Sequence, residues 1–285
     1  MDTEITGSTR VFGVIGHPVG HTLSPLMINA AFKERGLDCI YLPFHVEKKL
    51  LHKAIEGMRG LNIAGLNVTI PHKVEVMKLL DDIDESARAA GAVNTIVNNN
   101  GILRGLNTDG EGFLYALNRA GIGVSEKRIV VLGAGGASRA VISVLAANNA
   151  LITILNRTLE KARDLARAGA ERVTIEAMVL NPDNLALAIS KADILVNTTS
   201  VGMTPGDNVS PVPAALLKRT LTVVDIVYNP IKTKLIDDAG KAGCTIVEGV
   251  HMLVGQGALA FEQWTGKNAP VEMMTAIALE NLQKK

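Results

Sequence analysis

The stretch Val130-Val131-Leu132-Gly133-Ala134-Gly135-Gly136-Ala137-Ser138-Arg139-Ala140 decides the fold of this chain. A short apolar run ends in a glycine cluster, and a helix-like pattern follows through Leu145 and Ala146. This order is typical of the βαβ unit that binds dinucleotides, in which Gly133 permits the tight turn and Gly135 lets the backbone approach a pyrophosphate. The free N–H groups of the new helix then face the phosphates. The candidate cofactor contacts in this loop are Gly133, Ala134, Gly135, Gly136 and Ala137.

Strand and helix patterns alternate on both sides of this loop, which indicates an α/β protein. The expected strands are Val11–Ile15, Cys39–Val46, Ala64–Ile70, Ile129–Leu132, Leu151–Leu155, Ile194–Asn197, Thr222–Ile226 and Thr245–Glu248. Asn100-Gly101 between two apolar runs predicts a hairpin with a type I′ turn. We expect an N-terminal open α/β substrate-binding domain over 1–108, completed by 249–285. We expect a Rossmann-type doubly wound domain over 109–248, with an active-site cleft between the two domains.

Helix patterns in the first third supply two more specific expectations. Ser24-Pro25 fits the N-cap and first residue of a helix that runs to about Arg35 and stops at Gly36. Glu47–Met58 fits an amphipathic helix with Leu50, Leu51, Ile55 and Met58 on its buried face.

Composition excludes several classes of protein. The 285 residues include 29 Lys plus Arg and 28 Asp plus Glu, for a net charge of +1, so nucleic acid and an anionic membrane are not expected partners. The N-terminus is polar and no apolar run reaches membrane-spanning length, which predicts neither a signal peptide nor a membrane helix. The two cysteines lie far apart and outside any CxxC pattern, which favours a reduced, cytoplasmic protein. No interface is recognisable, so a monomer and a homodimer both stay open.

Small polar residues gather at strand ends and in the loops beyond, where open α/β sheets bind ligands. They are Thr22, Ser24, Asn67, Thr69, Lys73, Asn94, Asn107, Thr108 and Asp109. Hydroxyls, amides, one cation and one anion suit a small polyhydroxylated acid.

Each of these residues also has an ordinary structural explanation. Ser24 and Asp109 fit helix caps, Asn94 and Asn107 fit turns, and Lys73 fits a solvated lysine, although a helix N-terminus disfavours a cation. His17, His21 and His72 match no zinc spacing, so no metal site is predicted.

The residues after the second Rossmann strand indicate which cofactor is bound. NAD-specific units usually have an acid there, which holds the ribose 2′-hydroxyl. This chain has Asn156-Arg157-Thr158, and an Arg guanidinium suits a 2′-phosphate, with Lys161 one turn further. We therefore favour NADP, against the alternative that Arg157 is only a surface charge.

Ordered motifs over almost the whole chain resemble the shikimate dehydrogenase family. They are His21-Thr22-Leu23-Ser24-Pro25, Asn67-Val68-Thr69-Ile70-Pro71-His72-Lys73, Gly91-Ala92-Val93-Asn94-Thr95, Asn107-Thr108-Asp109-Gly110, Asn156-Arg157-Thr158, Asn197–Met203, Val227-Tyr228-Asn229-Pro230 and Met252–Gly257. The family usually has Ser where this chain has Thr22, which keeps the hydroxyl and adds a methyl group.

The resemblance implies roles for individual residues. Lys73 and Asp109 would form the catalytic pair. Thr22 and Ser24 would bind the substrate carboxylate. The other implied substrate contacts are Asn67, Thr69, Asn94, Asp109, Tyr228 and Gln256, and the remaining cofactor contacts are Thr198, Met203, Ile226 and Gly249.

The implied reaction is the reversible NADPH-dependent reduction of 3-dehydroshikimate to shikimate, which needs no metal. The sequence leaves open which of Lys73 and Asp109 delivers the proton. The alternatives are a quinate/shikimate dehydrogenase that uses NAD, a non-catalytic sensor of shikimate or nucleotide, and an amino-acid or folate dehydrogenase of similar architecture.

Overall fold

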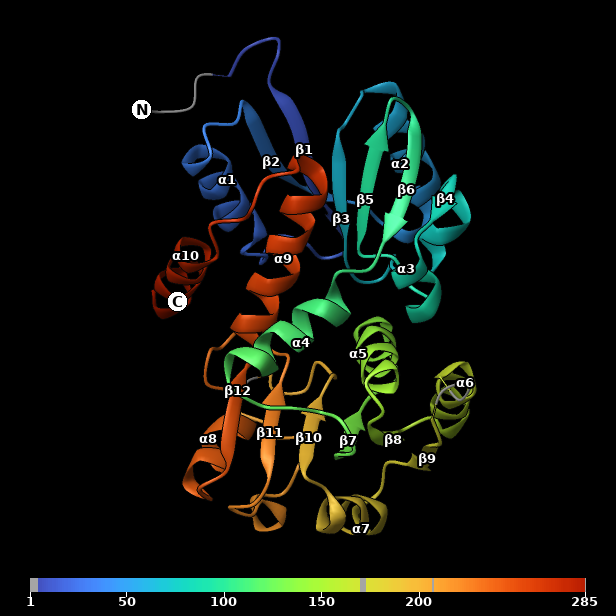
Figure 1. Ribbon diagram of the computed structural model, residues 1–285, viewed down its shortest axis with the longest axis vertical. Helices are drawn as coiled ribbons and strands as arrows, with labels where there is room; N and C mark the ends of the chain where they lie inside the picture. Colours follow the sequence, from blue (N-terminus) through green and yellow to red (C-terminus); the bar gives the residue numbers. More distant parts are fainter. Residues whose placement is uncertain (1–4, 170–172, 207, 285) are drawn as a thin grey trace. The chain divides into compact units, whose positions relative to one another are not determined.

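A computed structural model of the chain describes residues 5–169, 173–206 and 208–284. The chain divides into two compact units, Met1–Asp109 with Val254–Lys284, and Gly110–Leu253. Each unit is built on a six-stranded sheet (Figure 1). The α/β class and the Rossmann-type second half that the sequence predicts are confirmed.

The sheet of the first unit is mixed. Its strands are β1 (Arg10–Gly16), β2 (Cys39–His45), β3 (Gly65–Val68), β4 (Asp82–Ile83), β5 (Thr95–Asn99) and β6 (Ile102–Leu106). They lie in the order β2-β1-β3-β5-β6-β4, with β1 parallel to β2 and β3, and β5 antiparallel to β3 and β6. The predicted hairpin is confirmed, because Asn100 and Gly101 have φ of 53° and 92° between the paired residues Asn99 and Ile102.

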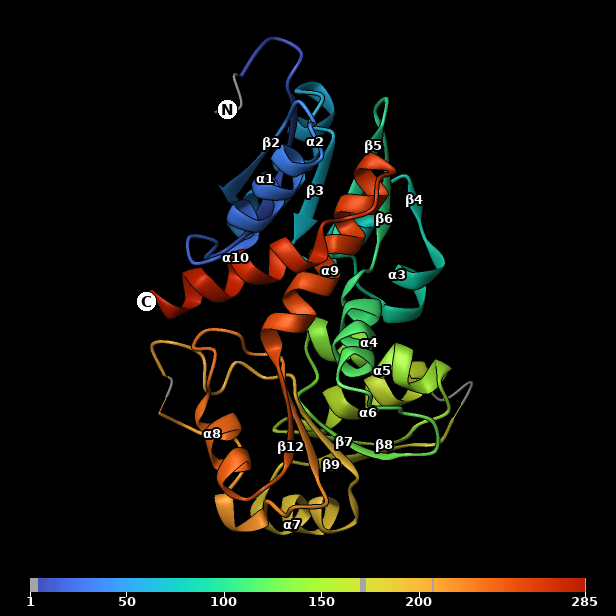
Figure 2. The ribbon, with the colours of Figure 1, turned by 60° about the vertical axis from the view of Figure 1, so that its left-hand side comes forward.

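The helices of the first unit cover this sheet. They are α1 (Ser24–Glu34), α2 (Leu51–Gly60), α3 (Glu85–Ala90), the part of α9 (Gly249–Thr265) from Val254 onward and α10 (Val271–Gln283), with 3₁₀ turns at Lys48–Leu50 and Glu75–Leu79. Helix α10 packs against α1 (Figure 2). The indole N–H of Trp264 in α9 donates to the carbonyl of Ile96 in β5 at 3.0 Å, and the Trp264 ring lies 5.2 Å from that of Phe12. Segments from both ends of the chain therefore share one core.

Two local predictions in this unit are wrong. Ser24 is the first residue of α1 rather than its cap, because Leu23 occupies the cap position and no side chain caps the helix. Leu50 lies in the 3₁₀ turn before α2 and is 41% exposed, because the chain tightens there and rotates the side chain off the buried face.

The second unit has a parallel sheet. Its strands are β7 (Arg128–Leu132), β8 (Leu151–Asn156), β9 (Ile175–Val179), β10 (Ile194–Asn197), β11 (Thr222–Asp225) and β12 (Thr245–Glu248). Its helices are α4 (Asp109–Arg119), α5 (Gly136–Ala147), α6 (Leu159–Gly169), α7 (Pro182–Lys191) and α8 (Lys234–Lys241), with a 3₁₀ turn at Ala214–Leu216. The order β12-β11-β10-β7-β8-β9 is that of a Rossmann sheet.

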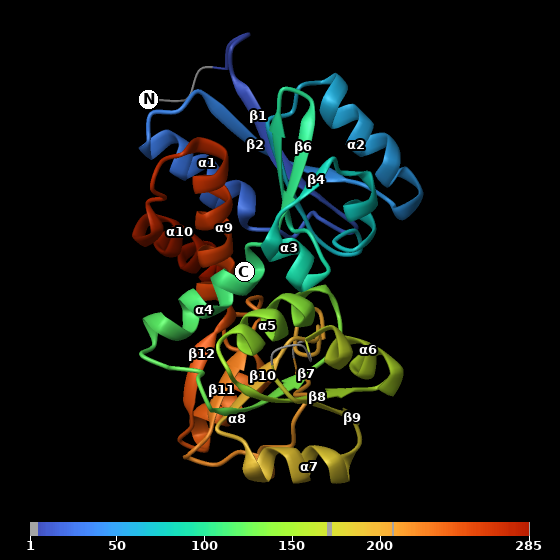
Figure 3. The ribbon, with the colours of Figure 1, turned by 45° about the vertical axis from the view of Figure 1, so that its right-hand side comes forward.

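Strand residues of the second unit alternate between two hydrophobic cores. Ile129 and Val131 belong to the core that α4, α5 and α6 cover, whereas Val130 and Leu132 belong to the core of α7 and α8. Figure 3 shows α5 and α6 on one side of β7 and β8 and α7 on the other. Because both faces are covered, the strands are apolar throughout, as the Val130–Leu132 run predicts. No helix among the described residues is long and apolar enough to cross a membrane.

Candidate active site

Lys73 and Asp109 form an ion pair in the first unit. Lys73 Nζ lies 2.5 Å from Asp109 Oδ2, and the two side chains are 15% and 6% exposed. Lys73 lies in the turn before the 3₁₀ turn at Glu75–Leu79, and its carbonyl accepts from the backbone N–H of Val93 at 2.7 Å. This backbone bond fixes the lysine beside the entry to β5. The structure thus brings together the two residues for which the sequence implies catalysis.

Sheet register explains why residues distant in the sequence meet here. Asn67, the last but one residue of β3, pairs with Thr95, the first residue of β5, and Thr95 pairs with Leu106, the last residue of β6. The residues just outside these three positions therefore lie at one edge of the sheet. They include Asn94 before β5 and Asp109 after β6.

Asn94 is the centre of a buried hydrogen-bond network. Its Nδ2 donates to Asp109 Oδ1 and Thr108 Oγ1, both at 2.9 Å, and more weakly to Gln256 Oε1 at 3.4 Å. Its Oδ1 accepts from the backbone N–H of Thr108 at 2.8 Å. The amide therefore orients the carboxylate of Asp109 and links it to Gln256 on α9.

The two hydroxyls after β1 lie together. Thr22 Oγ1 donates to Ser24 Oγ at 3.1 Å and accepts from the Ser24 backbone N–H at 3.2 Å. Ser24 is 8% exposed, whereas Thr22 is half-buried. Each hydroxyl has one hydrogen, so the pair could donate twice to a carboxylate once the Thr22 hydroxyl turns away from Ser24.

Asn67 has its hydrogen-bonding groups occupied by protein. Its Nδ2 donates to the carbonyl of Asn94 at 3.2 Å and to Thr95 Oγ1 at 3.1 Å, and its Oδ1 accepts from the hydroxyl of Tyr41 at 2.7 Å. Burial raises the pKa of Tyr41, against the smaller opposite effect of its hydrogen bond with Ser24, so the phenol stays protonated and donates. Asn67 thus connects β2, β3 and β5 beneath the site.

The remaining substrate candidates lie at more open positions. Thr69 follows β3 and is half-buried, and its backbone N–H donates to the carbonyl of Ile15 at 2.9 Å. Tyr228 follows β11 in the second unit and is half-buried.

The glycine loop of the second unit has the geometry that a dinucleotide requires. Gly133 has a φ of +107°, and a Cβ there would lie 2.9 Å from Thr198 Oγ1. Gly135 is the N-cap of the twelve-residue helix α5, and a Cβ there would meet no protein atom within 4 Å. The protein's own packing therefore does not require a glycine at position 135, and the N-terminus of α5 is open to an anion there.

A chain of hydroxyls fastens this loop to the sheet. The Gly135 N–H donates to Ser138 Oγ at 3.1 Å, Ser138 Oγ lies 2.6 Å from Thr198 Oγ1, and Thr198 Oγ1 donates to the carbonyl of Leu132 at 2.6 Å. Each hydroxyl has one hydrogen, so Ser138 donates to Thr198. The Thr198 hydroxyl is thus engaged within the protein at the point where the strand order reverses.

Three residues at the end of β8 present polar groups. Asn156 Nδ2 donates to the carbonyl of Thr158 at 2.9 Å, which fixes the turn. Arg157, Thr158 and Lys161 are exposed. Within the ranges that the structure describes, neither Arg157 nor Lys161 has a side-chain hydrogen bond or an ion pair. Two cations are thus available for an anionic group.

The other predicted cofactor contacts follow β10, β11 and β12. Met203 is 49% exposed and Ile226 is half-buried. Gly249 is buried, and a Cβ there would lie 2.6 Å from the carbonyl oxygens of both Ile226 and Val227. A glycine is required at position 249 because two backbone segments touch there.

Known proteins match the chain over nearly its whole length. Family models match residues 14–96 (shikimate dehydrogenase substrate binding domain), 116–234 (shikimate/quinate 5-dehydrogenase) and 249–279 (shikimate 5′-dehydrogenase C-terminal domain). The shikimate dehydrogenase (NADP(+)) of Methanopyrus kandleri is 48% identical, over 99% of both chains. The chain belongs to the shikimate dehydrogenase family.

Solved shikimate dehydrogenases have the same fold. A crystal structure in complex with NADP+ superposes with a TM-score of 0.91 at 42% identity, covering 98% of each chain. The Thermus thermophilus enzyme in complex with NADP(H) and shikimate gives 0.86 at 35% identity, covering 95% of this chain and 99% of its own.

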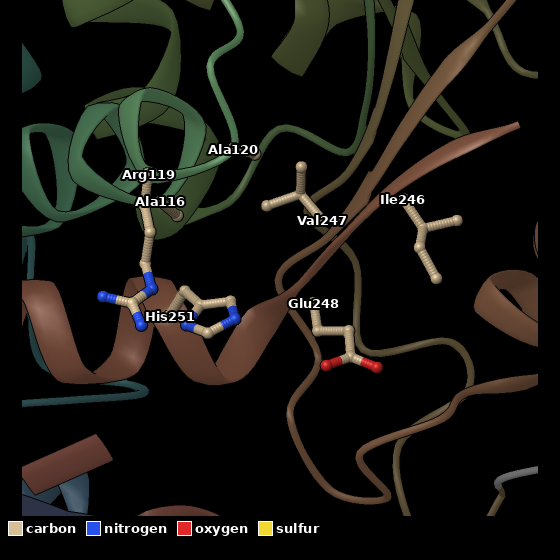
Figure 4. Close-up of a pocket in the computed structure, with 7 residues that line it drawn as sticks. All are labelled: Ala116, Arg119, Ala120, Ile246, Val247, Glu248 and His251. Atoms are coloured by element: carbon tan, nitrogen blue, oxygen red, sulfur yellow. The ribbon is translucent and has the colours of Figure 1, made fainter. Parts of the chain in front are cut away.

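The second unit also has a cavity of about 320 Å³, lined by Ala116, Arg119, Ala120, Ile246, Val247, Glu248 and His251. Figure 4 shows the His251 ring between Arg119 and Glu248. Burial, and then Arg119, lower the pKa of His251, so the ring is neutral at physiological pH. None of these residues belongs to the predicted site.

The described part of the chain contains no group of three or more His, Cys, Asp or Glu placed to hold a metal ion.

Sequence reasoning did not single out Tyr41 or Asp225. Tyr41 lies inside β2 and Asp225 ends β11; both strands have ordinary apolar patterns, and the polar contacts of the two residues depend on tertiary structure. Asp225 does carry a signal, because a carboxylate that ends an apolar strand needs buried hydrogen-bond donors.

Proposed function

We infer that the chain catalyses the reversible NADP-dependent reduction of 3-dehydroshikimate to shikimate, a step of aromatic amino-acid biosynthesis. The observation that supports this most directly is the Lys73–Asp109 ion pair, at 2.5 Å, inside a cluster of hydroxyls and amides. A ketone reduction needs a proton source and a positive charge beside the developing alkoxide, and the pair supplies both.

Lys73 is the proton donor in this proposal. Asp109 accepts hydrogen bonds from both Lys73 and Asn94, as an ionised carboxylate does, so the proton of the pair belongs to Nζ. Asp109 orients the ammonium group, and Asn94 holds Asp109. In the oxidation of shikimate, Lys73 accepts the proton of the hydroxyl.

The substrate would be held by groups from several loops. The paired hydroxyls of Thr22 and Ser24 fit its carboxylate. Thr69, Asn94, Asp109, Gln256 and Tyr228 fit its ring hydroxyls, because amides and hydroxyls both donate and accept. Asn67 is the remaining substrate candidate, and its hydrogen bonds with Tyr41, Asn94 and Thr95 hold its amide in place.

When bound, NADPH would supply the hydride for the reduction, and NADP+ would accept it in the reverse reaction. The residues of the second unit fit it: Gly133 to Ala137 for the pyrophosphate, with Thr198, Met203, Ile226 and Gly249 toward the nicotinamide. Arg157 and Lys161 would hold the 2′-phosphate, with Asn156 and Thr158 shaping the turn. The absence of an acid after β8 favours NADP over NAD.

The test is a steady-state assay with shikimate or quinate and with NADP+ or NAD+, followed by the absorbance of the reduced nicotinamide. We expect the highest kcat/KM for shikimate with NADP+. A higher value for quinate with NAD+ would favour the quinate/shikimate alternative, and no turnover with any pair would favour a sensor.

We further propose a cytoplasmic location and either a monomer or a homodimer. Cys39 and Cys244 are free thiols, which is typical of proteins in a reducing compartment. Light scattering coupled to size-exclusion chromatography distinguishes the two assembly states.

A further inference from the structure

Asp225 is a buried carboxylate that the proposed chemistry does not use. It ends β11, is 0% exposed, and has no Lys, Arg or His partner in the described residues. Three donors surround it. Asn197 Nδ2 lies 3.0 Å and the Val227 N–H 3.1 Å from Oδ1, and the Thr233 hydroxyl lies 2.7 Å from Oδ2. A buried charge is retained only where such donors replace water.

The two oxygens of Asp225 have different tasks. Oδ1 binds the backbone just after β11 and the side chain that ends β10. Among the described residues, Oδ2 accepts from Thr233 alone; Thr233 is the N-cap of α8, and its hydroxyl also accepts from the Ile236 N–H at 3.2 Å. Loss of the Oδ1 contacts would therefore release the loops after β10 and β11, whereas loss of the Oδ2 contact would affect the start of α8.

Asn197 carries the effect of Oδ1 into the loop after β10. Its Nδ2 also donates to the carbonyl of Val201 at 3.2 Å. Its Oδ1 accepts from the backbone N–H and the hydroxyl of Thr199, at 3.1 and 2.7 Å. Thr199 Oγ1 in turn accepts from the Val201 N–H at 3.1 Å. The whole segment 197–201 is thus tied to one carboxylate oxygen.

We propose that Asp225 is a positioning residue for the reaction: through Oδ1 it holds the segments after β10 and β11, which carry Met203, Ile226 and Tyr228. This inference rests on the proposed function, which assigns those three residues to the cofactor and the substrate. Burial without a cation among the described residues is the cost of this arrangement, and the three hydrogen-bond donors offset it.

Four variants separate positioning from general stability. Asp225→Ala and Asn197→Ala remove the loop contacts, and Asp225→Asn keeps the Oδ1 acceptor while it removes the charge. Thr233→Val is the matched control, because it removes the Oδ2 contact and the cap of α8 only. KM and kcat for NADP+ and for shikimate, and the Tm, are measured for each.

We expect Asp225→Ala and Asn197→Ala to raise both KM values roughly tenfold or more, since small misplacements of binding groups are costly. Asp225→Asn should recover most of that loss, and Thr233→Val should lower the Tm with unchanged KM. Unchanged KM values in Asp225→Ala, or equal KM changes in Asp225→Ala and Thr233→Val, would overturn the inference.

Two measurements distinguish its failure from failure of the proposed function. Wild-type turnover of shikimate with NADP+ tests the function alone. If that turnover is absent, the Kd of NADP+ for the same four variants, measured by titration calorimetry, still tests whether Asp225 holds the cofactor segments. An unchanged Kd in Asp225→Ala then overturns the inference.

Discussion

Asn94 Nδ2 donates to Asp109 Oδ1 at 2.9 Å, although the two residues are 15 positions apart in the sequence. Register within the β5–β6 hairpin places them side by side, because Thr95 and Leu106 are paired at its open end. The amide leaves Asp109 Oδ2 directed at Lys73. A hairpin register thus sets the geometry of the candidate catalytic pair.

Asn94→Asp tests this relationship with almost no change of shape. The new carboxylate would face Asp109 where an N–H now donates, and two carboxylates this close cannot both be ionised near neutral pH. We expect kcat/KM for shikimate to fall roughly a hundredfold. Activity should recover in part at lower pH, where one of the two carboxyl groups keeps its proton. A pH profile that superposes on the wild-type profile would contradict the assigned role of Asn94.

Lys73→Met tests proton donation. The variant keeps the length of the side chain but has neither charge nor proton, so kcat should fall roughly 10²–10⁴-fold. The Kd of NADP+, measured by calorimetry, should be unchanged, because the cofactor candidates lie in the other unit. Lys78→Met is the control, since Lys78 is exposed and pairs with Glu75 rather than with a site residue. Equal kcat in Lys73→Met and wild type would remove Lys73 from the mechanism.

Arg157→Ala tests the choice of cofactor. Loss of a charged hydrogen bond to a 2′-phosphate should raise the KM for NADP+ roughly tenfold to a hundredfold and leave the KM for NAD+ nearly unchanged. Arg163→Ala is the control, because Arg163 is an exposed arginine of α6 that pairs with Glu160. Similar changes of both KM values in Arg157→Ala would exclude a 2′-phosphate role.

Gly135→Ala and Gly249→Ala test whether the packing of the protein itself requires a glycine at each of these two cofactor candidates. A methyl group at 135 meets no protein atom within 4 Å, so the Tm should be unchanged while NADP+ binds more weakly. A methyl group at 249 would lie 2.6 Å from two backbone oxygens and should cost about 1–3 kcal/mol of stability. Thermal unfolding and NADP+ titration of both variants check this. Unaltered NADP+ affinity in Gly135→Ala would mean that no phosphate approaches that loop.

Asp225 gives the unfolding free energy a specific pH dependence. Burial raises its pKa from 3.8 to about 6, against the hydrogen bonds from Thr233, Val227 and Asn197. The folded state therefore binds the proton of Asp225 more tightly than the unfolded state does. The stabilisation that this proton gives the folded state is complete below about pH 4 and is lost as the pH rises through about 6.

Asp225→Asn removes that dependence. The stability of the variant relative to wild type should therefore increase with pH across this interval, by up to about 3 kcal/mol. Urea unfolding at a series of pH values measures the difference. A difference that stays constant with pH would show that Asp225 has an ordinary pKa in the folded protein.

Much of the fold could be predicted because it follows from local patterns. The Gly133–Ala137 loop, the Asn100-Gly101 turn and the strands β10 and β12 depend on residues that are near one another in the sequence. The helix start at Ser24 and the exposure of Leu50 could not be predicted, because both depend on how the chain turns before a helix begins. The strands β4 and β9 and the helix α7 carry patterns too short or too polar to stand out.

The sequence by itself determined the α/β class, the dinucleotide loop and the residue types of the candidate site, since these depend on periodicity, glycine and the order of motifs. Only the tertiary structure decided which side chains face one another. It placed Lys73, Asn94 and Asp109 in one network through strand register, bonded Asn67 to Tyr41 of β2, and engaged the Thr198 hydroxyl in the glycine loop. It also revealed Asp225, whose donors come from three separate segments. Hydrogen bonds between distant residues leave no periodic trace in a sequence, because their distances and directions are fixed only when the sheets form.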